Sequence, residues 1–114
     1  MCSACHQPHG RGQPGLAPPL EDSEWVNGPV SRIGRIVLHG VYGPIMVAGQ
    51  KYQLDMPAFG AALSDEQIAA ILTYIRREWE HTATSVTPQT IADIRTATKD
   101  KASAWVEEEL KEVP

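Results

Sequence analysis

The sequence has few aromatic residues, few cysteines and no long apolar run. Of its 114 residues, seven are aromatic and two are cysteine. No apolar run approaches the roughly 18 residues that a transmembrane helix needs, so we expect no membrane span in this chain. Aromatic side chains supply much of the volume of a small core. Their scarcity predicts that something other than packed side chains helps to fill the interior.

Basic residues are also scarce. Ten Lys and Arg residues stand against 14 Asp and Glu residues, which gives a formal net charge of −4. Binding of nucleic acid depends on a basic surface, so this balance argues against nucleic acid as a partner. The remaining composition, 42% apolar and 21% charged, is typical of a folded chain, and the length fits one domain.

The two cysteines stand together at the start of the chain, in the run Cys2-Ser3-Ala4-Cys5-His6. The spacing Cys-x-x-Cys-His is typical of the attachment of a c-type haem. On a helix that turns about 100° per residue, both thiols and the imidazole face the same side. Two thiols there could bond the vinyl groups of a haem while the imidazole reaches the iron. We therefore predict one covalent haem c, attached through Cys2 and Cys5, with His6 as an iron ligand.

Three other interpretations of the motif stay open. A dithiol redox pair usually follows a strand of a βαβ unit, and no strand pattern precedes this one. A zinc site needs a second pair of Cys or His ligands, and the other histidines form no recognisable pair. A structural disulfide leaves His6 without a role. A thiol–disulfide redox module without haem is the alternative that we keep.

The apolar periodicity predicts several helices separated by loops. The clearest covers residues 65–80, where Ser64 and Gln67 form a capping box. Thr87 and Pro88 predict the start of another helix that continues to about Thr98. The remaining predicted helices cover residues 2–9, 30–39 and 102–112. Residues 10–20 and 41–63 are predicted to be loops, with a possible hairpin from Val47 to Tyr52 that turns at Ala48-Gly49.

A haem iron that transfers electrons needs a second axial ligand, and Met56 is the first candidate. It lies in a loop just before the strongest predicted helix, and Pro57 restricts the backbone beside it. A thioether is neutral and soft, so it favours reduced iron and raises the reduction potential. We predict Met56 as this ligand. The weaker candidates are Met46, His39, His9 and His81.

These features together resemble the class I c-type cytochromes across residues 2–81, and most of all the cytochrome domains of bacterial multidomain oxidoreductases. The resemblance rests on the Cys2–His6 motif, Gly12 and Pro18-Pro19-Leu20, Met56-Pro57-Ala58-Phe59, the helix from Leu63 through Tyr74-Ile75-Arg76, and Trp79. It implies a small all-α domain wrapped around a covalent haem. It also implies that the carbonyl of Pro18 or Pro19 accepts a hydrogen bond from His6, and that Met56 is the distal ligand.

The sequence departs from this family at both ends. Such cytochromes usually carry a helix ahead of the motif, and we expect that helix to be missing or to lie on a removed segment of a longer exported protein. Residues 82–114 extend past the usual end of the family. We predict a cytochrome c domain over residues 1–84 and a C-terminal helical extension over residues 85–114, packed on the same domain.

The predicted function is electron transfer by the haem with His/Met axial ligation, so that the chain is an electron carrier and not itself an enzyme. The alternative is an electron-relay domain cut from a larger haem-containing dehydrogenase. If Met56 does not bind the iron, the open position could instead take a small gas or a peroxide. Partners would be redox proteins or a fused dehydrogenase. The protein would be monomeric and periplasmic, or otherwise outside the cytoplasmic membrane. Candidates to bond the haem propionates are Trp25, Arg32, Arg35 and Tyr52.

Overall fold

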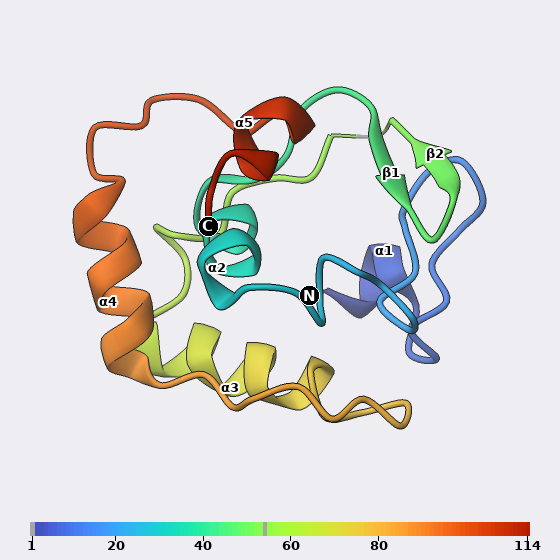
Figure 1. Cartoon of the computed structure of the whole chain (residues 1–114), viewed down its shortest axis with the longest axis horizontal. Coiled ribbons are helices and arrows are strands. Elements are labelled where there is room, and N and C mark those ends of the chain that lie inside the picture. The colour runs from blue at the N-terminus through green and yellow to red at the C-terminus, as the bar shows by residue number, and fades with distance from the viewer. Residues whose placement is uncertain (1, 54) are drawn as a thin grey trace.

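The computed structural model describes residues 2–53 and 55–114, so Met1 and Leu54, which belongs to the predicted Met56 loop, lie outside the described residues. Within that part of the chain, five helices and one two-stranded antiparallel hairpin are connected by long loops (Figure 1). The architecture is therefore mainly helical, and the hairpin is its one departure from the predicted all-α class. The elements are α1 (Ser3–His6), α2 (Val30–His39), β1 (Ile45–Val47), β2 (Gln50–Tyr52), α3 (Asp65–Ile75), α4 (Pro88–Ala97) and α5 (Glu107–Lys111).

The helix starts follow the capping signals of the sequence. Ser64 and Gln67 form the predicted capping box of α3, in which each side chain bonds the main chain of the other residue. The Thr87 side chain accepts a hydrogen bond from the Thr90 N–H, and Pro88 occupies the first turn of α4. Helix α2 has the predicted bounds, and it ends at Gly40, whose φ of +80° favours glycine.

The prediction that the helix of α3 continues to residue 80 was wrong. The helix ends at Ile75, and Trp79 and Glu80 have positive φ angles of 53° and 66°. The His81 side chain donates from Nδ1 to the carbonyl oxygen of Ile75 at 2.8 Å, so it satisfies one of the free carbonyls at the helix end. Trp79 fits the apolar period, but the chain has already turned when it reaches this residue.

Two other predicted helices are shorter in the structure. Helix α1 covers four residues instead of eight, because Gln7 adopts a φ of 66° and ends it. Helix α5 begins at Glu107 instead of residue 102. Before it, Trp105 is extended and forms a parallel bridge with Val41. A main chain that hydrogen-bonds to a neighbouring segment in this way cannot also be helical.

The predicted hairpin is present and slightly longer than expected. Ile45 pairs with Tyr52 and Val47 pairs with Gln50. Ala48 and Gly49 form the two-residue turn, with φ angles of 49° and 80°. Two positive φ values match the twist of an antiparallel hairpin, which explains why so short a ribbon has a defined register.

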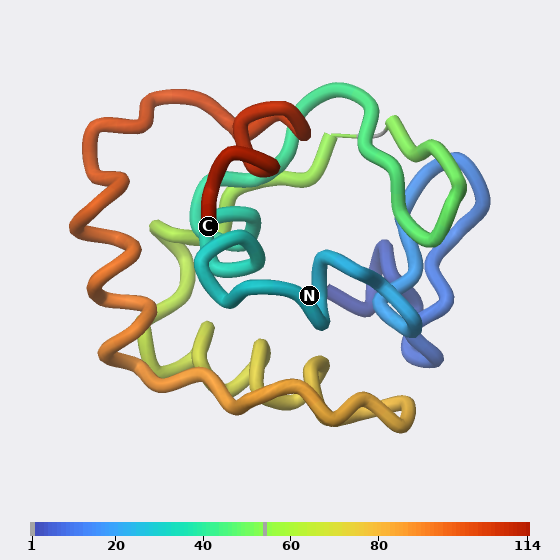
Figure 2. Tube along the Cα trace, viewed as in Figure 1, coloured from blue at the N-terminus to red at the C-terminus, as the bar shows by residue number. Residues whose placement is uncertain are grey.

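The core lies where α2, α3 and α4 meet. In Figures 1 and 2, α2 lies near the middle of the molecule, with α4 to its left, α3 below it, and α1 and the hairpin to its right. Helix α4 packs on both α2 and α3. Gly34 allows this approach, because a Cβ atom there would lie 2.7 Å from Cδ1 of Ile94. The side chains of Ile68, Leu72, Ile91 and Leu110 are fully buried in this core.

None of the helices in the described chain combines the length and the apolar character that crossing a membrane requires.

Candidate functional site

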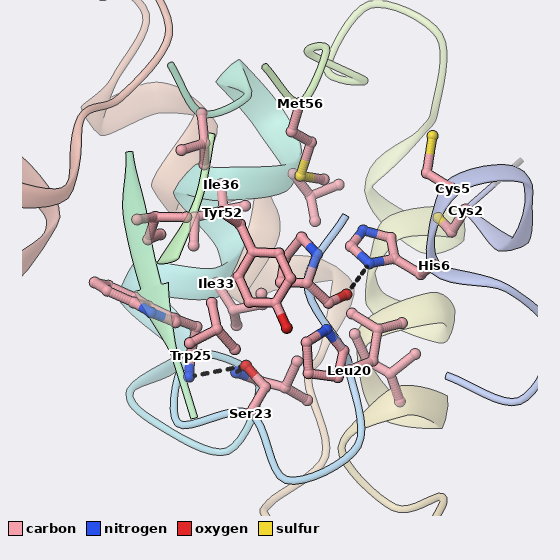
Figure 3. A pocket seen from close by; sticks show the side chains of 18 of the residues that line it. Cys2, Cys5, His6, Leu20, Ser23, Trp25, Ile33, Ile36, Tyr52 and Met56 are labelled. Carbon is pink, nitrogen blue, oxygen red and sulfur yellow. Dashed lines mark hydrogen bonds between the residues drawn. The ribbon is translucent and has the colours of Figure 1, made fainter. Parts of the chain in front are cut away.

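A large apolar cavity lies between α1, α2, α3, the hairpin and the loop of residues 55–59 (Figure 3). Its empty space, including the open mouth, is about 1110 Å³. An open cavity with an apolar wall and a few polar groups at its edge is typical of a ligand or cofactor site. Its apolar wall includes Leu20, Val26, Ile33, Ile36, Val37, Val41, Ile45, Val47, Phe59, Ile71, Leu72 and Ile75.

His6 lines this cavity from the end of α1. The side chain is only 9% exposed, and its Nδ1 lies 2.7 Å from the carbonyl oxygen of Pro18. A carbonyl oxygen accepts hydrogen bonds and cannot donate them, so Nδ1 carries the proton and Nε2 has a free lone pair. Of the two prolines expected to accept this bond, Pro18 does so, while Pro19 lines the cavity.

The two cysteines of the motif lie at the rim of the same cavity. Both thiols are free, Cys2 half-buried and Cys5 exposed, and both line the cavity beside His6 (Figure 3). The main chain of this turn holds the three residues together, because the N–H groups of Cys5 and His6 both donate to the carbonyl oxygen of Cys2, at 3.2 and 2.9 Å. Two thiols and one imidazole beside an apolar cavity fit a haem that is bound covalently and ligated from one face.

The zinc interpretation finds no support in the described residues. No group of three or more His, Cys, Asp or Glu side chains gathers there in a way that could hold a metal ion. The donor set at this site suits a haem better than a bare metal ion, because a haem brings four ligands of its own.

Met56 reaches the cavity from another part of the chain. Its half-buried side chain extends into the cavity from the loop that precedes α3 (Figure 3). The main chain of Met56 is fixed by Val41, because the Met56 N–H donates to the Val41 oxygen at 2.9 Å and the Val41 N–H donates to the Met56 oxygen at 3.1 Å. The loop approaches so closely because its neighbour Gly40 has no side chain. A Cβ atom at Gly40 would lie 2.3 Å from the Met56 oxygen.

Two of the weaker ligand candidates point to solvent. Met46 lies on the outer face of β1 and is 43% exposed. Its neighbours Ile45 and Val47 face inward and line the cavity. His9 is exposed, and its Nδ1 accepts a hydrogen bond from the Arg11 N–H at 3.0 Å. Neither side chain lines the cavity.

The other two candidates do not line the cavity, and their ring nitrogens have hydrogen-bond partners of their own. His39 Nε2 lies 2.8 Å from the Thr98 hydroxyl oxygen. Burial, followed by the nearby charge of Lys101, lowers the pKa of His39 below its ordinary value. His81 bonds the Ile75 oxygen through Nδ1, and its Nε2 accepts from the Asp22 N–H at 3.1 Å. Among the five residues considered, the structure brings only Met56 to the same cavity as His6.

Two of the four residues proposed to bond haem propionates, Arg32 and Arg35, lie outside the cavity. Arg32 donates to the carbonyl oxygens of Val113 and Lys111 near the C-terminus. Arg35 donates to the Ser31 oxygen, and neither arginine lines the cavity. Trp25 lines it but donates its Nε1–H to the carbonyl oxygen of Met46 at 2.8 Å.

Tyr52 and Ser23 are the hydroxyl-bearing residues that line the cavity in the described chain. Ser23 is 3% exposed, and its oxygen accepts hydrogen bonds from the N–H groups of Trp25 and Val26 at 3.2 and 3.3 Å. The hydroxyl proton of Ser23 is therefore free to be donated to a ligand. No sequence pattern indicates this position of Ser23, because a lone serine in a loop gives no signal of burial.

Arg76 is a buried cation behind the cavity wall, and the sequence analysis assigned it no such role. It is 3% exposed. Its Nη1 donates to the carbonyl oxygens of Val26 and Gly28 at 2.9 and 2.6 Å, and its Nε donates to the Thr84 oxygen at 2.9 Å. Burial lowers the pKa of Arg76. The guanidinium thus joins the end of α3 to the loop that carries Trp25 and Val26.

Known proteins with similar sequences indicate the family of this chain. Residues 1–75 match the family model described as "Cytochrome C oxidase, cbb3-type, subunit III". The chain is 41% identical over 89 residues to cytochrome c-552 of Thermus thermophilus, which covers 69% of this chain and 63% of that protein. It is 36% identical over 101 residues to the gluconate 2-dehydrogenase cytochrome c subunit of Pantoea cypripedii, which covers 82% of this chain and 22% of that subunit. The chain thus spans less than two thirds of the length of either relative.

Proposed function

The chain belongs to the family of c-type cytochromes, and on that premise we propose that His6 and Met56 bind the iron of its haem c from opposite faces. Members of this family carry a covalently attached haem c, and Cys2 and Cys5 are the chain's only cysteines. The haem supplies one-electron chemistry between Fe(III) and Fe(II). The observation that carries the ligand assignment is that His6 and Met56 line one apolar cavity.

The proposed work of His6 depends on its partner Pro18. Because the 2.7 Å hydrogen bond keeps the proton on Nδ1, Nε2 is available for the iron in one tautomer and one ring orientation. The bond also increases the basicity of the imidazole. Pro18 is thus a positioning residue, and it contributes its main-chain oxygen and not its ring.

The proposed work of Met56 is to set the reduction potential and to keep other ligands away. A thioether is neutral and stabilises Fe(II) relative to Fe(III), so the potential is higher than with a second histidine. The apolar side chains around it exclude water, which favours the less charged state of the iron centre. Ser23 and Tyr52 are the proposed donors to a haem propionate, because both hydroxyls line the cavity.

We further propose that residues 1–84 are the haem domain and residues 85–114 a C-terminal extension packed on it. The packing of α4 on α2 and α3 supports the placement of this extension on the haem domain. In this proposal the chain carries electrons and converts no substrate itself. It acts as a monomeric domain and resides in the periplasm or elsewhere outside the cytoplasmic membrane, where bacteria attach haem c.

A relay in a larger dehydrogenase is the second candidate function. The similarity to a cytochrome c subunit of gluconate 2-dehydrogenase favours it. In that case the electron donor is a dehydrogenase that is fused to the chain or associated with it. Rapid reduction of the purified haem protein by such an enzyme and its substrate would distinguish this role from that of a freely diffusing carrier.

The ligand assignment is tested by an optical spectrum of protein made in a host that attaches haem c. Haem that stays with the polypeptide after extraction with acidified acetone establishes covalent attachment. The ferric protein should show the far-red charge-transfer band of sulfur–iron ligation, and Met56→Ala should remove it. Met46→Ala is the matched control and should keep the band. A band that survives in Met56→Ala but is lost in Met46→Ala would overturn the assignment.

A further inference from the structure

The loop that carries Met56 is held by Arg95, a residue of the C-terminal segment (residues 85–114). Arg95 lies on α4 and extends to the far end of this loop. Its Nη1 donates to the Gly60 oxygen at 2.5 Å and its Nη2 donates to the Leu63 oxygen at 3.1 Å. Its Nε bonds Oδ1 of Asp65 at 2.9 Å. One guanidinium therefore fixes the last residues of the loop and the first turn of α3 at the same time.

The near end of the loop is connected to the C-terminal segment by main-chain hydrogen bonds. Val41 pairs with Met56 on one side and with Trp105 on the other. The Trp105 N–H donates to the Gly40 oxygen at 2.9 Å, and the Tyr42 N–H donates to the Trp105 oxygen at 2.8 Å. The three short segments form a ladder. In it the segment of Val41 lies between the loop of Met56, here called the distal loop, and the C-terminal segment.

Trp105 is held in this ladder by its own contacts. The Lys101 ammonium lies 4.6 Å from the centre of the indole ring, and His39 contacts the ring edge-on with the ring centroids 6.3 Å apart. The two contacts come from different elements, because His39 ends α2 and Lys101 follows α4. The C-terminal segment thus has a fixed position from which it can support the segment beside it.

We propose that the C-terminal segment positions Met56: Arg95 holds the end of the Met56 loop directly, and the main chain of Trp105 supports the segment of Val41 that pairs with Met56. This inference rests on the proposed role of Met56 as an iron ligand. A thioether is a weak ligand, so it competes with stronger external ligands only if the loop is already ordered in the binding position. Arg95 and Trp105 supply that order, and they do so without contact with the site itself.

The test compares the affinity of ferric holoprotein variants for imidazole, a ligand that replaces the thioether on the iron. Arg95→Gln should increase this affinity on the order of tenfold, because the Gly60 and Leu63 carbonyls lose their charged donor. Arg95→Lys keeps the charge but has no planar fork, so its affinity should lie between those of the wild type and Arg95→Gln. Arg77→Gln is the control, because Arg77 is exposed and the described structure gives its side chain no hydrogen bond or ion pair.

Thermal unfolding of the same variants separates positioning from stability. A lower melting temperature of Arg95→Gln with unchanged imidazole affinity would mean that Arg95 only stabilises the fold, and would overturn the inference. If Arg95→Gln does not fold, unchanged imidazole affinity in Arg95→Lys would overturn it equally. Loss of the sulfur–iron band already in the Met46→Ala control and not in Met56→Ala would instead contradict the proposed function.

Discussion

Gly40 and Met56 approach so closely that a Cβ atom at Gly40 would lie 2.3 Å from the carbonyl oxygen of Met56. Gly40 also has a φ of +80°, and its N–H donates to the Ile36 oxygen at the end of α2. One residue therefore ends a helix and allows the distal loop to approach that helix. The position of Met56 thus depends on the end of α2.

Gly40→Ala should move the loop away and weaken the proposed bond between the Met56 sulfur and the haem iron. An alanine at this position is strained by the positive φ. Its methyl group also clashes with main-chain atoms, which cannot rotate away as a side chain can. Gly49→Ala is a matched control, because Gly49 has the same φ of +80° and nothing within 4 Å of its Cβ position. Gly40→Ala should be less stable than this control by about 1–3 kcal/mol in urea unfolding. The far-red band of Gly40→Ala should also be weaker than that of Gly49→Ala. Equal stability and equal bands in the two variants would show that the clash is absent.

Arg76 should be essential for stability although it lies outside the cavity. Arg76→Gln removes the donors to Val26, Gly28 and Thr84, and it leaves the buried Val26 carbonyl and two half-buried carbonyls without these partners. We expect a loss of about 2–4 kcal/mol in the free energy of unfolding. The adjacent exposed residue gives the control, since Arg77→Gln should change this free energy by less than about 0.5 kcal/mol. Similar losses in both variants would contradict the structural role of the buried guanidinium.

Ser23→Ala should affect the loop behind the cavity. The substitution leaves the N–H groups of Trp25 and Val26 without their acceptor in a buried position. The expected cost is about 1–3 kcal/mol in the free energy of unfolding of the holoprotein, measured with urea. Ser85→Ala, at an exposed residue, should have no measurable cost. A neutral Ser23→Ala variant would mean that other groups satisfy these donors.

His39 should make the stability fall in mild acid. Burial and the charges of Lys101, Arg35 and Arg95 lower the pKa of His39 below 6.5 in the folded protein. The unfolded chain therefore takes up a proton first as the pH falls, and the folded state loses stability relative to it. The contribution of His39 is fully present above pH 6.5 and is lost as the pH falls through its lowered folded pKa.

The pH dependence is measured as the urea midpoint at about pH 7.5 and about pH 5.5. His39→Gln should reduce the difference between the two midpoints. His9→Gln, at an exposed histidine, should leave it as in the wild type. If His39→Gln has the same difference as the wild type, the acid sensitivity comes from other groups.

Those features of the fold that depend on neighbouring residues could be predicted from the sequence. The starts of α3 and α4 follow from side chains that cap their own helices, and the bounds of α2 follow from its apolar period and Gly40. The turn at Ala48-Gly49 is equally local, because two adjacent residues provide both positive φ angles. The Cys2–His6 motif could likewise be predicted, since the groups that define it lie in five consecutive residues.

Features that depend on distant partners were mispredicted or missed. The end of α3 depends on His81, which returns to the Ile75 carbonyl, and the start of α5 depends on the pairing of Trp105 with Val41. Arg32 and Arg35 were proposed as propionate ligands, but neither lines the cavity, and their side chains donate to main-chain carbonyl groups instead. No pattern along the chain gives these positions, because each one depends on where another segment lies in space.

The apolar wall of the cavity also bears on how the protein matures. Side chains of α2, α3 and the hairpin face one another across the space where the porphyrin belongs, so the haem is their shared packing partner. We therefore expect the chain before haem attachment to be largely unfolded, with weak far-UV circular dichroism. Helical dichroism as strong before attachment as afterwards would contradict this. Such an unfolded precursor would offer both thiols to the attachment enzymes, and its native shape would form only once the haem is bound.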